Sequence, residues 1–118
     1  MSPEQPAKLL RIHVSEADRH LGRPLFEALV EKCREMQISG ATVFRGLEGF
    51  GDTAGMHKSH LTWHDQPIVI VIVDSAENVG RLVEAAGGMI DTGLMAISDV
   101  RAIRVHKNSP SGTEVGAD

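Results

Sequence analysis

Several residue and segment types are scarce in this sequence, and each absence excludes a class of protein. Cys33 is the single cysteine, so no disulfide forms within the chain. No stretch approaches the roughly 18 to 20 consecutive apolar residues of a membrane-spanning helix. The first apolar run, 9–14, is too short for the core of a signal peptide. These absences predict a cytoplasmic protein.

Positive charge is also scarce. The 118 residues include 12 lysines and arginines against 16 aspartates and glutamates, which gives a formal net charge of −4. A general nucleic-acid-binding surface needs concentrated lysine and arginine, so this class of protein is excluded. A local basic cluster that binds a small phosphorylated ligand is still compatible with the composition. The length favours one domain with a modest core.

Hydrophobic periodicity predicts this domain over residues 7–106, between flexible tails at 1–6 and 107–118. Strands and amphipathic helices follow one another in the order βαββαβ. The predicted strands are 8–14, the start of 41–51, 67–73 and 94–106; the predicted helices are 24–37 and 74–86; and 15–24 and 52–66 are polar connections. Two strand–helix–strand halves give the ferredoxin-like α+β fold, a four-stranded antiparallel sheet with two helices on one face.

Local signals predict where the helices begin and end. Gly40 is expected as the glycine that ends the first helix, which carries Cys33 as a partly buried, reduced thiol. Asp74 or Ser75 is expected to cap the second helix. Asp74 and Glu77 have the spacing of a capping box.

The strand at 68–73 has no polar face. All of its residues are isoleucine or valine, so β-branched side chains point to both sides of the sheet. The helices cover one side only, and each valine or isoleucine exposed on the other side would forgo about 1.5–3 kcal/mol of burial. The pattern therefore predicts a homo-oligomer in which another copy covers this face. The alternative is a central strand covered by its own loop.

Two glycine-containing segments resemble those of PII signalling proteins. Residues 40–51, GATVFRGLEGFG, are similar to the PII strand that ends in Gly-Phe-Gly before the T-loop. Residues 87–105, GGMIDTGLMAISDVRAIRV, are similar to the PII segment from the B-loop into the last strand. Residues 8–51 look most like the PII-like family catalogued as domain of unknown function 190. On this resemblance, which covers about 7–106, the chain is identified as a member of that family.

The resemblance implies a homotrimer of ferredoxin-like subunits with the sheets packed around the centre. It also implies an adenine nucleotide in each cleft between subunits, with the T-loop and B-loop as the cleft walls. Residues 52–66 would then be a mobile, T-loop-like segment that signals to a partner. Genes of this family often lie beside fluoride-channel genes, which implies a membrane transporter or channel as that partner.

Several positions depart from the PII pattern. Asp52 and Thr53 follow Gly51 where PII proteins have arginine and glutamine, which argues against 2-oxoglutarate sensing. Leu94 replaces the B-loop lysine, and His106 stands at the second arginine of the Arg-x-Arg pair. The T-loop tyrosine has no counterpart, because the chain contains no tyrosine. The reduced positive charge favours a nucleotide with few phosphates or another small anionic ligand over a triphosphate.

The candidate ligand-binding residues combine a glycine-rich turn with basic side chains. Glycines let backbone N–H groups approach an anion closely, and Asp91 or Thr92 suits a ribose hydroxyl. Arg104 and His106 are two residues apart in the predicted last strand and would share one face, with Arg104 as a forked phosphate donor. The full set is Gly49, Gly51, Gly87, Gly88, Asp91, Thr92, Gly93, Arg104 and His106. The alternative is structural: the glycine pair ends the helix, and 91–93 forms an ordinary turn.

His57, His60 and His64 form a second group of candidate residues. Their spacings of three and four residues would place them on one side of a helical turn, where they suit zinc or copper. They lie in the 52–66 loop with Asp65 and without a cysteine, so solvated loop histidines are the alternative.

Catalytic groups are harder to identify. No serine lies in a strand–turn–helix elbow, and Cys33 lies on a predicted helix without an identifiable base. The sequence therefore predicts a non-catalytic sensor that requires no cofactor. A metal-binding trimer that uses the loop histidines and a small ferredoxin-like enzyme are the alternatives.

Overall fold

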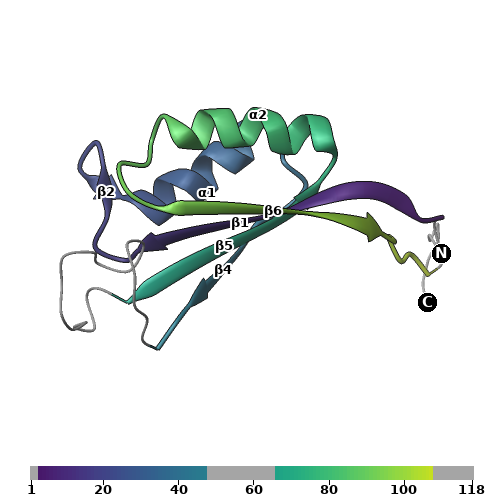
Figure 1. Cartoon of the computed structure of the whole chain (residues 1–118), viewed down its shortest axis with the longest axis horizontal. Helices are drawn as coiled ribbons and strands as arrows, with labels where there is room; N and C mark the ends of the chain where they lie inside the picture. Colours follow the sequence, from purple (N-terminus) through teal and green to yellow (C-terminus); the bar gives the residue numbers. More distant parts are fainter. Residues whose placement is uncertain (1–2, 48–65, 108–118) are drawn as a thin grey trace.

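The structure is a computed structural model that describes residues 3–47 and 66–107 (Figure 1). The elements are β1 (Gln5–Ser15), β2 (Arg19–His20), β3 (Arg23–Pro24), α1 (Leu25–Glu35), β4 (Thr42–Arg45), β5 (Pro67–Asp74), α2 (Ala76–Gly87) and β6 (Leu94–Ala102). The longer elements follow the predicted βαββαβ order. Neither helix in the described ranges has the length and hydropathy needed to cross a membrane.

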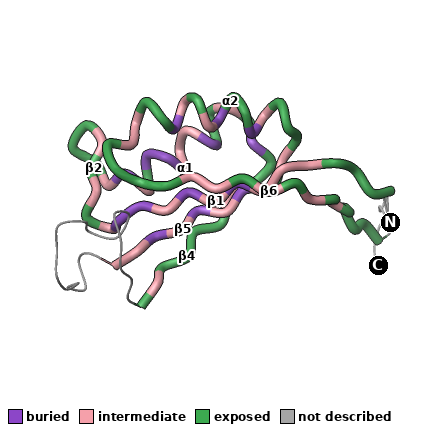
Figure 2. Tube along the Cα trace, in the orientation of Figure 1, coloured by how far each residue is buried: buried purple, intermediate pink, exposed green. Residues whose placement is uncertain are grey.

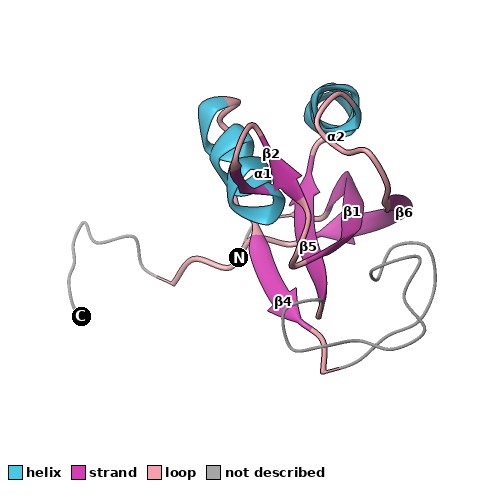
Figure 3. Ribbon diagram, turned by 90° about the vertical axis from the view of Figure 1, so that its left-hand side faces the viewer, coloured by secondary structure: helices cyan, strands magenta, loops and turns pink. Residues whose placement is uncertain are grey.

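The longer strands form one antiparallel sheet in the order β4-β5-β1-β6. β1 lies inside the sheet, where Ile12 is opposite Ile70 of β5 and Met95 of β6. Both helices lie over the same face of the sheet (Figures 1 and 3). The ferredoxin-like arrangement predicted from the periodicity is therefore confirmed.

The core lies between the sheet and the helices. Alternate residues of β1 and β5 point toward the helices, and each is at most 1% exposed. These residues are Leu10, Ile12 and Val14 of β1 and Ile68, Ile70 and Ile72 of β5. Buried positions of both helices close the core on its other side (Figure 2). They include Leu29 of α1 and Leu82 of α2. Since a fully buried aliphatic side chain contributes about 1.5–3 kcal/mol, this two-layer core is the main source of stability.

The opposite face of the sheet, here called the open face, is not covered by any helix of the described chain. It carries the odd-numbered residues of β1 and β5 and the even-numbered residues of β4 and β6. Phe44 is 55% exposed, Leu94 54% and Val73 39%. Val69 and Val71 are half-buried. The prediction that the strand at 68–73 has no polar face is confirmed, and apolar side chains meet solvent on the open face of the single chain.

The end of α1 differs from the expected signal. The helix ends in a Schellman motif, in which the Ile38 N–H donates to the Cys33 carbonyl at 3.0 Å. The Gln37 N–H donates to the Arg34 carbonyl at 3.1 Å. Gln37, with a φ of 60°, takes the left-handed position. The expectation that Gly40 would end the helix is therefore wrong, because α1 ends at Glu35 and Gln37 takes the left-handed position three residues before Gly40.

The start of α2 also corrects one expectation. Ser75 is the N-cap, and its hydroxyl accepts a hydrogen bond from the Asn78 N–H at 3.1 Å. The prediction of a capping box between Asp74 and Glu77 is wrong, because Asp74 precedes the cap by one residue. The alternative expectation, a Ser75 cap, is confirmed.

A short hairpin, β2–β3, lies in the segment expected to be a polar connection. Its paired residues are Arg19 with Pro24 and His20 with Arg23. The two-residue loop between them, Leu21 and Gly22, has φ values of 51° and 81°, and a type I′ turn requires positive φ at both positions. Leu21 is 88% exposed. A leucine in this conformation is strained, and its exposed side chain gains little burial in return.

Replacing Leu21 with asparagine is expected to stabilise the protein. Asparagine adopts positive φ at lower cost than leucine, and Asn-Gly is the favoured pair in a type I′ turn. Leu21→Asn should raise the free energy of unfolding, measured by urea denaturation, by about 0.5–1 kcal/mol. Leu21→Val is the matched control and should lower it, because β-branched residues tolerate positive φ least. A Leu21→Asn protein no more stable than wild type would contradict the strain argument.

Candidate ligand-binding site

The segment from the last residue of α2 to the start of β6 contains the predicted residues Gly87, Gly88, Asp91, Thr92 and Gly93. α2 ends at Gly87, and Gly88 is its C-cap. The N–H groups of residues 88–90 donate to carbonyls of the last helical turn, over 2.9 to 3.2 Å. The N–H groups in the first half of the turn therefore cap the C-terminus of α2 and are not available to a ligand. Asp91 and Thr92 follow it and are exposed, so their side chains are accessible to a ligand.

The space around each glycine shows whether packing requires glycine at that position. A Cβ on Gly93 would lie 2.9 Å from the His13 carbonyl oxygen and 3.0 Å from Cγ2 of Ile90, so packing against β1 requires glycine there. A Cβ on Gly87 would meet nothing within 4 Å, and one on Gly88 would have its nearest contact at 3.6 Å. Neither of these two has a positive φ. The fold therefore does not demand glycine at 87 and 88, and the surface beside them is open.

Arg104 and His106 lie beyond the other end of β6. The strand ends at Ala102, opposite Gln5 at the start of β1, so it has no partner with which to continue. Residues 103–107 are irregular, and the prediction that Arg104 and His106 share a strand face is wrong. β6 is nine residues long, or about 30 Å. The glycine turn and Arg104 lie beyond opposite ends of β6 (Figure 1 shows this strand), so within one chain they are too far apart to contact one small ligand.

Arg104 instead lines a pocket of about 570 Å³ at its end of the sheet. The pocket lies between the loop that follows α1, the end of β5, and the segments where β1 begins and β6 ends. Its lining residues are Pro3, Gln5, Ser39, Gly40, Ala41, Thr42, Val71, Val73, Ala102, Ile103 and Arg104. Residues 39–42 are missing from the predicted set, although the run Ser-Gly-Ala-Thr is a signal for a backbone that a ligand can approach closely.

Asp74 fixes the position of Ser39 in this pocket. One carboxylate oxygen of Asp74 accepts hydrogen bonds from the Ser39 N–H and hydroxyl, each at 2.9 Å. The other oxygen accepts from the Ser75 N–H at 2.7 Å and from the Asn78 side-chain amide at 3.1 Å. Partial burial acts to raise the pKa of Asp74, but these donors outweigh it and lower the pKa below its ordinary value. One carboxylate thus joins the pocket loop, β5 and α2.

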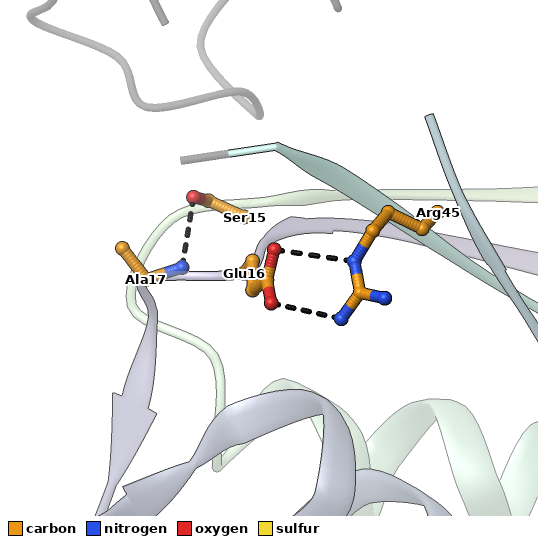
Figure 4. A network of polar contacts seen from close by, with 4 residues as sticks. All are labelled: Ser15, Glu16, Ala17 and Arg45. Atoms are coloured by element: carbon orange, nitrogen blue, oxygen red, sulfur yellow. Dashed lines mark hydrogen bonds and ion pairs between the residues drawn. The ribbon is translucent and has the colours of Figure 1, made fainter. Parts of the chain in front are cut away.

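A second polar cluster lies at the opposite end of β1, beside Glu16. Arg45, the last residue of β4, donates to both carboxylate oxygens of Glu16, over 3.2 and 2.8 Å (Figure 4). The Glu16 N–H donates to the Gln66 carbonyl at 2.9 Å. The Gly46 N–H donates to the Pro67 carbonyl at 2.8 Å. The end of β4 and the start of β5 therefore lie side by side, and both are bonded to Glu16 at the end of β1 or to each other.

The remaining predicted residues lie outside the described part of the chain. They are Gly49, Gly51, His57, His60 and His64. Within 3–47 and 66–107, no three His, Cys, Asp or Glu side chains are grouped as a metal site. Cys33 is buried on α1, and this burial raises the pKa of its thiol, so it is not an activated nucleophile.

Solved structures of PII-like proteins share this fold. CPII from Thiomonas intermedia K12, bound to ADP and bicarbonate, is 24% identical with a TM-score of 0.62, over 88% of this chain and 95% of that one. A protein from Thermus thermophilus, described as PII-like signaling, is 20% identical with a TM-score of 0.64, over 87% and 94% of the two chains. The fold is that of the PII-like class.

Sequence relatives identify the family within this class. Residues 7–102 match the DUF190 family, described as an uncharacterized ACR. A UPF0166 protein of Aquifex aeolicus (strain VF5) is 37% identical over 98 residues, which cover 81% of this chain and 92% of that protein. The chain belongs to the DUF190 family, as the resemblance predicted.

Gly93→Ala is expected to destabilise the protein. The added Cβ would lie 2.9 Å from a backbone oxygen, and overpacking of this kind costs about 1–3 kcal/mol. Gly87→Ala is the matched control: it adds the same methyl group to open space at the end of α2 and should leave the free energy of unfolding unchanged or raise it. Chemical denaturation of both variants checks this. Equal effects at the two positions would contradict the packing role of Gly93.

Asp74→Asn is expected to remove a pH-dependent part of the stability. The folded-state pKa of Asp74 lies below the value of about 3.9 for an unfolded chain. Between the two values the unfolded state binds more protons, so the Asp74 contribution is complete above the unfolded pKa and is lost as the pH falls through the folded pKa. At neutral pH the variant should be about 1–2 kcal/mol less stable in urea denaturation.

The difference between wild type and Asp74→Asn should shrink as the solution is acidified below the unfolded pKa. Asp99→Asn, which removes an exposed carboxylate paired with Lys8, is the control and should have the smaller effect. A difference for Asp74→Asn that stays constant with pH would show that its hydrogen bonds do not depend on ionisation.

Proposed function

We propose that the protein is a non-catalytic, PII-like regulatory protein that forms a homotrimer and binds an adenine nucleotide in each cleft between neighbouring copies. The main support for this proposal is that the glycine turn and Arg104 lie at opposite ends of β6. The glycine turn precedes the strand and Arg104 follows it, about 30 Å further along. A nucleotide cannot contact both in one chain. A head-to-tail contact between copies brings the turn of one copy to the Arg104 pocket of the next.

The open face supports the assembly. Phe44, Leu94 and Val73 leave apolar area exposed on the single chain. Exposed apolar side chains gathered on one sheet face are typical of a protein–protein interface. Three copies around a threefold axis would cover one another's open faces, as the resemblance to PII proteins implies. Such a cyclic trimer has three equivalent clefts and therefore binds one ligand per chain.

The chemistry of the pocket favours a nucleotide with few phosphates. Its volume of about 570 Å³ lies within the range of about 300–1,000 Å³ for small-molecule sites. Arg104 is a forked phosphate donor, and the Thr42 hydroxyl can donate to a phosphate. The Ser39 hydroxyl, which donates to Asp74, can accept from a ribose hydroxyl. Leu94 provides no charge where PII proteins have lysine, which favours ADP or AMP over ATP. The ADP bound to CPII, a fold relative, supports the same ligand class.

Residues 52–66 are proposed to transmit the ligand state to a partner, with a membrane transporter or channel as the partner class. β1 offers a physical connection between the two regions. Gln5 at its start lines the pocket, and Glu16, directly after its end, bonds to Arg45 ahead of the segment and to Gln66, the last residue of the segment. A ligand that shifts β1 would therefore act on both anchors of the signalling segment.

Calorimetric titration of the full chain with AMP, ADP, ATP and cyclic di-AMP, with and without Mg²⁺, tests the ligand. We expect saturable binding of about one nucleotide per chain. Arg104→Ala should weaken binding about 10- to 100-fold, because a charge-assisted phosphate contact contributes about 1.5–3 kcal/mol. Arg101→Ala is the control, since Arg101 lies on the helix-covered face beside Glu4 and should not contact the ligand. A folded trimer that binds none of these nucleotides would overturn the ligand assignment.

Mixed trimers test whether the site is shared between copies. One variant carries Arg104→Ala, and the other carries Asp91→Ala with Thr92→Ala. Each variant alone should bind poorly. After refolding at a one-to-one ratio, about a quarter of the clefts combine an intact turn with an intact arginine, so about a quarter of the sites should regain affinity. No recovery would contradict a cleft built from two copies.

A further inference from the structure

The open face carries two basic side chains, Arg11 and His13 of β1, among mostly apolar residues. Directly opposed residues of antiparallel strands share a face, so Arg11 lies between Val71 of β5 and Ala96 of β6. His13, two residues further along, also lies between two apolar residues. Within the described strands, no aspartate or glutamate lies on this face. The open face therefore combines an apolar surface with an uncompensated positive centre.

The other basic residues of the four-stranded sheet are all paired, which sets Arg11 and His13 apart. The pairs are Lys8 with Asp99, Arg45 with Glu16 and Arg101 with Glu4. By the register, all three paired cations belong to the helix-covered side of the sheet. In the described chain, neither Arg11 nor His13 has an ion-pair partner, and both side chains are already half-buried before any second copy is added.

Assembly through the open face would remove these groups from water. Arg11 lies in the middle of β1, one of the two inner strands, and so near the centre of the open face. A cyclic trimer brings the three copies of this residue to the same height around the axis. Burying unpaired guanidinium groups costs several kcal/mol each, and like charges at close range add repulsion. An apolar interior with three such cations needs an anion.

We propose that the interior of the trimer binds one small oxyanion, of the phosphate or sulfate class, between the Arg11 side chains of the three copies, with His13 as a further donor. The proposal rests on the trimer of the proposed function. Guanidinium groups bind tetrahedral oxyanions through forked, charge-assisted hydrogen bonds. The ion would lie on the symmetry axis and would be distinct from a nucleotide phosphate in the clefts. It would hold the assembly together by neutralising its centre.

Stoichiometry distinguishes the axial ion from cleft ligands. Nucleotide-free protein is prepared in chloride and titrated with inorganic phosphate at constant ionic strength. Native mass spectrometry should show one phosphate per trimer, whereas a nucleotide cleft binds one ligand per chain. Phosphate should also raise the thermal midpoint and the fraction of trimer, measured by sedimentation velocity, more than chloride does.

Arg11→Met tests the residue while keeping the side-chain volume similar. The variant should form trimers without phosphate and should lose at least about tenfold in phosphate affinity, because an apolar residue removes both the charge and the need for a counterion. Arg101→Met, on the helix-covered face, is the control and should retain the wild-type response. A wild-type trimer that binds no phosphate, or binds it equally well after Arg11→Met, would overturn the ion site alone. A chain that stays monomeric in both buffers would overturn the proposed trimer as well.

Discussion

The rest of the structure depends on one strand, β5, that has apolar side chains on both sides. Its isoleucines face the helices and are at most 1% exposed, while its valines face the opposite side. The two helices cover one face of the sheet and thereby complete the core of the single chain. β5 is an inner strand, because β4 and β1 pair with it on either side, so its valines lie within the open face and not at an edge of the sheet. The need to cover the open face is thus built into the sheet order.

Antiparallel pairing determines where the ligand-type residues lie once the sheet has formed. The strands run past one another, so the turn before β6 and the segment after it fall at opposite ends of the sheet. Asp74 secures one of these ends, since it holds Ser39 of the pocket loop while it also bonds to the start of α2. The Glu16–Arg45 pair secures the other end. The pocket loop and the start of β5 are therefore each tied to the sheet, at opposite ends of β1.

The long elements could be predicted from the sequence because each is specified by burial along its own length. The β2–β3 hairpin could not, because its strands have two residues each and show no period. Its turn also uses Leu21 where asparagine is expected. The left-handed position that follows α1 is taken by Gln37, which no local signal marks, whereas Gly40 is the residue type that this position favours. The glycine turn is contiguous in the sequence, so its motif was visible there, but the pocket joins distant segments that only the sheet topology brings together.

A site shared between copies, as proposed above, would link ligand binding to assembly. A ligand at about 100 times its Kd stabilises the bound state by about 2.7 kcal/mol per site, or about 8 kcal/mol for three sites in a trimer. The linkage is reciprocal, so whatever strengthens the interface also raises the ligand affinity. The open face of this chain contains both favourable and unfavourable terms: exposed Phe44 and Leu94 favour contact, and unpaired Arg11 opposes it. An interface balanced in this way responds more strongly to a bound ligand than a wholly apolar interface would, because the binding energy is then comparable with the net energy of assembly.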